Sequence, residues 1–146
     1  MKFPIFAVVI LASLAMFACG GSSDSDTGSV SSKDALESRA EAAAQAISND
    51  DWELYHTMFS PGSKASCQAA NFISAADASM SGYRDFLGIA PTAKFEFKVT
   101  KVSVDGDDGE VTMELRQGGE RLNEGSPEPW VQVDGVWGVV NDDCQF

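Results

Sequence analysis

The sequence predicts an α+β fold in which helices come first and a strongly curved antiparallel sheet follows. Apolar residues recur at helical spacing between residues 31 and 88, whereas from Lys94 onward they alternate with a period of two. Asp-Gly pairs at positions 105–106 and 134–135 mark tight turns between the alternating segments. The chain has 146 residues, 44% of them hydrophobic, which is enough for one domain with a core of its own.

Three helices are expected in the first half. A plausible N-cap and first turn at 31–34 lead into an amphipathic helix that ends near Ser48. Asp50 or Asp51 caps a short second helix, which ends at 60–62. The third helix covers 64–80, and Gly82 with the 83–88 turn closes the helical half. The apolar face of the second helix consists of Trp52, Tyr55 and Phe59.

A meander of four strands is expected in the second half. The first strand carries apolar residues on one parity up to Val99 and on the other from Val102, so a bulge or bend is expected near 100–101. A hairpin turn at 105–109 leads to a second strand through Leu115. Residues 117–127 are polar and rich in glycine, and they are expected to form a loop. Two further strands flank the turn at 134–135.

The charge balance excludes nucleic acid as a partner. The chain carries 10 Lys and Arg against 22 Asp and Glu, for a formal net charge of -12. A surface of that sign cannot neutralise phosphates.

The N-terminus resembles a bacterial lipoprotein signal. Met1 and Lys2 precede an apolar run over 3–18 that is short for a membrane span, and Ala18 then precedes Cys19. The resemblance implies a signal peptide at 1–18, lipidation of Cys19, and a Gly- and Ser-rich flexible tether through residue 32. The protein would then be exported and held by lipid at the cell membrane or outer membrane. An uncleaved anchor and an ordinary secreted protein are the alternatives.

The other two cysteines form an even pair. In an oxidising compartment, Cys67 and Cys144 are expected to form a disulfide that closes a long loop. Two buried free thiols are the competing interpretation. A catalytic thiol would need a histidine, and the chain has only His56.

The body of the chain, residues 33–146, resembles the nuclear transport factor 2-like family, whose fold is a cone of helices laid into a curved antiparallel sheet. The resemblance rests on the helix and Asn-Asp-Asp-Trp at 43–55, the Ser-Pro break at 60–61, the hairpin at 102–107, and the ending Trp-Val-Gln-Val-Asp-Gly-Val-Trp at 130–137. It supports the fold far more than any function.

Enzymes of that family place a general base opposite a hydrogen-bond donor inside the cone, and no such set aligns here. The candidates are Tyr55, His56, Asp77 and Tyr83. His56 is expected to be exposed because its neighbour Tyr55 takes the inner face, and Asp77 is expected to be solvated. The acidic turn at 105–110 departs from a calcium-binding loop at its fifth and twelfth places. No metal or cofactor is expected.

Three function classes follow. The first expectation is a non-catalytic domain that binds a small apolar ligand in the cone. The alternative is a protein-interaction module of the cell envelope that presents Trp130 or Trp137, and an isomerase or dehydratase comes third. Core packing is the plainer role for every aromatic concerned. The residues expected to line a pocket are Trp52, Tyr55, Phe59, Phe72, Phe86, Phe95 and Phe97.

Overall fold

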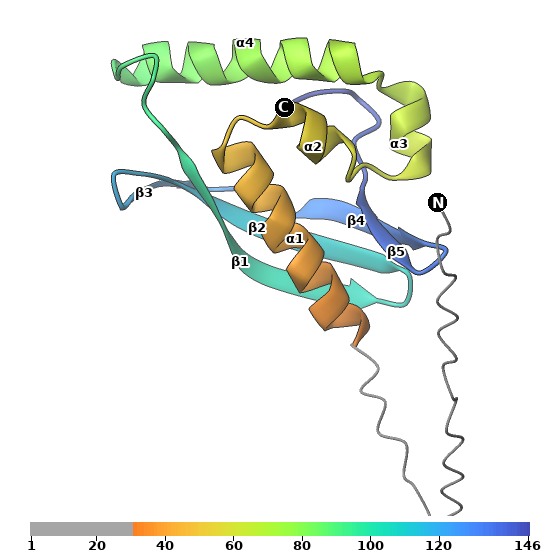
Figure 1. The fold of residues 1–146 in the computed structure, drawn as a ribbon. Coiled ribbons are helices and arrows are strands. Elements are labelled where there is room, and N and C mark those ends of the chain that lie inside the picture. The colour runs from red at the N-terminus through yellow and green to blue at the C-terminus, as the bar shows by residue number, and fades with distance from the viewer. Residues whose placement is uncertain (1–30) are drawn as a thin grey trace, which may run out of the picture.

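The computed structural model describes residues 31–146 as an α+β domain of four helices and five strands (Figure 1). The expected signal peptide, Cys19 and the tether up to residue 30 lie outside the described residues. The helices are α1 (Ser32–Ser48), α2 (Trp52–His56), α3 (Pro61–Ser66) and α4 (Ala69–Leu87). The strands are β1 (Glu96–Asp105), β2 (Asp108–Gln117), β3 (Glu120–Glu124), β4 (Glu128–Val133) and β5 (Val136–Val139).

The helix starts follow from capping side chains. Ser31 accepts a hydrogen bond from the Asp34 amide at the start of α1, and Asp51 accepts one from the Leu54 amide at the start of α2. Ser60 caps α3, so the 60–62 segment, which was expected only to end a helix, also begins one. The single helix expected over 64–80 is wrong: the chain breaks at 67–68, and α4 then runs to Leu87.

The sheet is antiparallel in the order β1-β2-β4-β5, and it does not close into a barrel. The expected bulge is confirmed, since the β1–β2 register shifts between Val99 and Lys101. The loop expected over 117–127 is wrong, because β3 pairs with the outer end of β2. All five residues of β3 are exposed, so the strand is held by its backbone pairing with β2 and not by burial of apolar side chains. For this reason its sequence shows no apolar alternation from which a strand could be predicted.

The molecule is layered, with α1 and α2 between the sheet and α4. Figure 1 shows α1 lying across the sheet and α4 crossing on the other side of α2. Small residues of α1, such as Ala40 and Ala43, are fully buried and let the helix lie close to the sheet. Trp130 and Trp137 belong to this core, with 1% and 2% exposure, so neither is presented to a partner.

A backbone segment extends the sheet beyond β5. Ser60 donates its amide hydrogen to the Val139 carbonyl, and Val139 donates to the Met58 carbonyl, at 2.8 and 2.9 Å. Gly138 permits this approach, because a Cβ there would lie 2.8 Å from the Ser60 Cα. The start of α3 is thereby held against the last strand.

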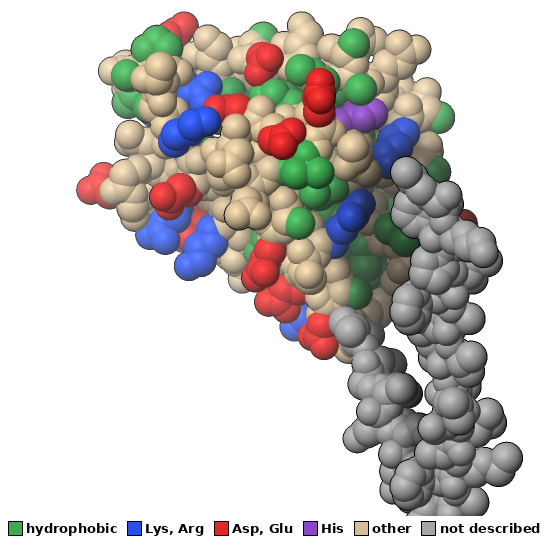
Figure 2. Space-filling view, in the orientation of Figure 1, with side chains coloured by type: hydrophobic (Ala, Val, Ile, Leu, Met, Phe, Trp, Pro, Cys, Tyr) green, Lys and Arg blue, Asp and Glu red, His purple; other side chains and the backbone are tan. Residues whose placement is uncertain are grey.

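No helix within residues 31–146 is both long enough and apolar enough to cross a membrane. On the face shown in Figure 2, acidic and basic side chains are interspersed and hydrophobic side chains are exposed between them.

Candidate functional site

A pocket of about 220 Å³ lies between the helical layer and the sheet. Its floor is the middle of β2, and its walls come from α1, α2, β1, the end of β3, the segment that joins β3 to β4, the start of β4, and Phe146. A larger groove of about 740 Å³ runs along α1 and β1 and is open to solvent. The lining residues of the smaller pocket are Ile47, Tyr55, Phe97, Val111, Met113, Leu115, Asn123, Gly125, Ser126, Glu128 and Phe146.

One carboxylate, that of Glu128, lies in this mostly apolar lining. The Tyr55 hydroxyl donates a hydrogen bond to Glu128 Oε1 at 2.6 Å, and the Trp130 indole Nε1 donates to Oε2 at 3.2 Å. Each carboxylate oxygen therefore has one protein donor. Among the described residues that line the pocket there is no Lys, Arg or His to balance the negative charge.

The pKa values of this pair follow from its surroundings. Burial raises the pKa of Glu128 above 4.5, although the hydrogen bonds from Tyr55 and Trp130 act in the opposite direction. Burial also raises the pKa of Tyr55 well above 10.0, and the charge and hydrogen bond of Glu128 add to that rise. Tyr55 is therefore neutral at physiological pH and serves as a hydrogen-bond donor.

Phe146 forms the boundary between this pocket and a second groove. The second groove, of about 420 Å³, lies along α4 and shares Phe97, Leu115 and Asn123 with the pocket. The Phe146 ring packs edge-on against Trp52 with 4.6 Å between ring centroids, and the Ser79 hydroxyl donates to the Phe146 carbonyl at 3.0 Å. The half-buried Phe146 side chain thus occupies space between α4 and the sheet that a ligand could otherwise fill.

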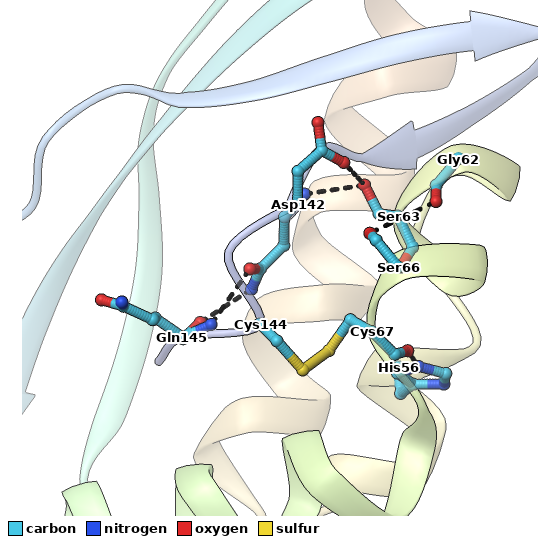
Figure 3. Close-up of a disulfide and its surroundings, with 9 residues drawn as sticks. His56, Gly62, Ser63, Ser66, Cys67, Asp142, Cys144 and Gln145 are labelled. Carbon is cyan, nitrogen blue, oxygen red and sulfur yellow. Dashed lines mark hydrogen bonds between the residues drawn. A yellow bond between two sulfur atoms is a disulfide. The ribbon is translucent and has the colours of Figure 1, made fainter.

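A disulfide ties the segment that carries Phe146 to the helices (Figure 3). Cys67 and Cys144 lie at bonding distance, with their Cα atoms 5.0 Å apart, as the even cysteine pair predicts. The Ser63 hydroxyl donates to Asp142 Oδ1 at 2.9 Å and accepts from the Asn141 amide at 2.9 Å. Asp142 and Asn141 therefore join the end of the chain to α3 through Ser63.

The residues expected to line a pocket separate into three groups. Tyr55 and Phe97 line the 220 Å³ pocket. Phe86 is 82% exposed and borders only the outer groove along α4, so its expected place inside a cone is wrong. The remaining four lie in the core and do not line that pocket: Trp52, Phe59, Phe72 and Phe95.

The expected exposure of His56 is also wrong. Its ring is half-buried beside Phe59 and Phe72, with centroids 5.0 and 6.0 Å away. Its Nε2 lies 2.8 Å from the Cys67 carbonyl oxygen. A carbonyl only accepts, so Nε2 donates there and His56 links α2 to the disulfide.

Neither Asp77 nor Tyr83 lines the 220 Å³ pocket. Asp77 is exposed as expected, and its Oδ1 accepts from the Trp52 indole at 2.7 Å. Tyr83 packs against Phe95, with 5.6 Å between ring centroids.

Sequence reasoning missed Glu128 and Phe146. Glu128 stands between Pro127 and Pro129 in a polar stretch, which concealed its membership of a strand. The signal that could have found it is parity, because Glu128 lies two residues before the inward-facing Trp130. Phe146 follows a run of polar residues, and no periodic pattern places its ring.

Neither a protein-family model nor a curated protein matches this chain. Solved structures match, among them that of a function-unknown protein from Mycobacterium tuberculosis, which is 14% identical. That match has a TM-score of 0.49 and covers 71% of this chain and 64% of the other. The chain therefore spans less than two thirds of the length of that protein.

Proposed function

We propose that this domain is a non-catalytic module that binds a small apolar ligand. The observation that carries the proposal is the apolar pocket of about 220 Å³ with the Tyr55–Glu128 pair in its wall. An apolar lining with a few convergent polar groups is typical of small-molecule sites. About seven molecules of liquid water occupy the same volume as this pocket, which is a size that suits a small ligand.

We further propose that the fold is a nuclear transport factor 2-like cone. The support is the order of elements, with helices before the sheet, together with the bulge in β1 and the position of α1 across the sheet. A bulge bends a strand and increases its twist, which helps a sheet to curve around a helix.

The ligand test uses the full chain, extracted from membranes in an uncharged detergent, and native mass spectrometry for co-purified small molecules. Leu115→Trp adds a large ring to the lining of the pocket, whereas Leu122→Trp adds the same ring on the exposed strand β3 outside it. We expect a bound small molecule in the wild type and in Leu122→Trp, and its loss in Leu115→Trp. Equal occupancy in the two variants would place the molecule elsewhere and contradict the proposal.

The anchor belongs to the same proposal. Cys19 would carry lipid, and the domain would face away from the cytoplasm on its polar tether. Cys19→Ser should release the protein from the membrane fraction or block its maturation. Unchanged membrane association, with the apolar run over 3–18 still attached, would identify that run as a permanent anchor instead.

One observation favours a second candidate, proton-transfer chemistry of the isomerase or dehydratase type. Glu128 is a desolvated carboxylate beside a tyrosine donor, although the bases that the sequence suggested were His56 and Asp77. A base and a donor must both reach the substrate, whereas Tyr55 and Glu128 hydrogen-bond to each other at 2.6 Å. Binding is therefore the better proposal, and turnover that Glu128→Gln abolishes would reverse the order.

A further inference from the structure

Glu128 lies in an apolar pocket and has no cationic partner among residues 31–146. The described residues form four ion pairs, each of which joins Arg or Lys to an acid, and none of them involves Glu128. Its two oxygens accept one hydrogen bond each, from Tyr55 and Trp130. A carboxylate offers about four acceptor positions, so about two are not used by the protein.

We propose that the pocket selects a ligand that joins an apolar group to a protonated amine, with the ammonium beside Glu128. This inference rests on the proposed function, since it specifies the ligand of the same pocket. The apolar part of the ligand would lie against Phe97, Met113 and Leu115, which line the pocket with Glu128.

The charge argument favours a cation over the other two ligand classes. An ammonium would fill the free acceptor positions and offset the cost of holding a carboxylate away from water. A neutral hydroxyl could donate one hydrogen bond without balancing the charge. A carboxylate ligand would place two negative charges together in surroundings that contain no Lys, Arg or His among the lining residues.

The tryptophans supply a built-in readout. The chain has three tryptophans, and each indole Nε1 donates to a different acceptor. The acceptor of Trp130 is Glu128, that of Trp52 is Asp77, and that of Trp137 is the Ser32 carbonyl. The Trp130 indole signal therefore reports on the charge environment of Glu128, and the other two serve as internal references.

The experiment titrates the full chain, labelled with ¹⁵N-tryptophan in an uncharged detergent, with three probes of similar size. These probes are 2-phenylethylamine, 2-phenylethanol and 3-phenylpropanoate. We expect the amine to shift the Trp130 indole signal and to bind about tenfold more tightly than the alcohol, which is the scale of a hydrogen bond to a charged group. The carboxylate probe should bind most weakly.

Two variants test whether Glu128 causes the preference for the amine. Glu128→Gln should lower the affinity for the amine to about that for the alcohol, so that the preference for the amine is lost, whereas Asp77→Asn, outside the pocket, should retain the preference. If the wild type binds the amine and the alcohol equally, the further inference is overturned while the apolar pocket stands. If none of the probes binds, the proposed function fails and the inference fails with it. The comparison of probes on the wild type decides the matter even if Glu128→Gln does not fold.

Discussion

Gly138→Ala tests whether the approach of the 58–60 segment to β5 holds the domain together. Gly138 lies in the last strand, and an added Cβ would stand 2.8 Å from the Ser60 Cα and 2.9 Å from the Ser60 nitrogen. Ordinary contact begins at 3.4 Å, so the Cβ falls about 0.6 Å short. The neighbours are backbone atoms, which cannot turn away as a flexible side chain could.

The expected loss of stability follows from what the displacement breaks. Two buried backbone hydrogen bonds join the 58–60 segment to Val139 of β5. Ser60 donates to the Val139 carbonyl at 2.8 Å, and Val139 donates to the Met58 carbonyl at 2.9 Å. Each contributes about 1 kcal/mol, and overpacking costs about 1–3 kcal/mol. We therefore expect Gly138→Ala, which breaks both bonds and overpacks the contact, to lower the free energy of unfolding by about 3–5 kcal/mol.

Urea unfolding of the oxidised chain, followed by tryptophan fluorescence, measures this change. Gly82→Ala is the matched control, because Gly82 lies within α4 and a Cβ there meets nothing within 4 Å. The control should gain about 0.5–1 kcal/mol from helix propensity. The reasoning is refuted if Gly138→Ala stays within about 0.5 kcal/mol of the wild type while the gain of Gly82→Ala is resolved.

Three further predictions concern charge, covalent linkage and the pocket boundary. Asp50 accepts hydrogen bonds from Arg84 and Lys94, each at 3.0 Å. Burial alone would raise its pKa, but the hydrogen bonds from Lys94 and Arg84 outweigh burial and lower it below 3.8. Asp50→Asn should therefore cost about 1–3 kcal/mol in urea unfolding at pH 7, and the difference should shrink as the pH falls through the lowered pKa; a constant difference on acidification would disagree. Cys67→Ser should lower the free energy of unfolding by about 4 kcal/mol, because the disulfide loop is lost. If a reductant leaves the free energy of unfolding of the wild type unchanged, this prediction is wrong. Phe146→Ala should join the two cavities and increase the affinity for 2-phenylethanol in the indole titration, whereas unchanged affinity would show that the ring does not limit access.

Residues whose structure depends on near neighbours were predicted well. Caps were expected within 31–34 and at Asp50 or Asp51, and Ser31 and Asp51 cap α1 and α2 through contacts three residues away. The turn at 134–135 needs positive φ angles, and Asp134 and Gly135 adopt 52° and 77°. The bulge near Thr100 was visible because the alternation of apolar side chains changes parity there.

The errors lie where distant segments decide the outcome. The exposed residues of β3 form a strand only because the outer end of β2 offers free backbone groups. His56 is drawn inward by the Cys67 carbonyl, eleven residues away, although its neighbour Tyr55 occupies the inner face. The Phe86 side chain is exposed because α4 continues as a helix to Leu87 and packs against the rest of the domain through other residues.

Periodicity, turn chemistry and a count of thiols predicted the α+β class, the order of most elements and the pairing of the two cysteines, because each of these can be inferred without knowing how the elements pack. Only the tertiary structure brought Tyr55 within 2.6 Å of Glu128, which lies 73 residues further along the chain, and placed Phe146 at the pocket they share. The periodicity of apolar residues indicates which face of a helix or strand is buried, but it does not indicate which other element packs against that face. A site assembled from α2, β4 and the end of the chain is therefore fixed by packing between elements, where the relevant distances are set by volumes and not by neighbours in sequence.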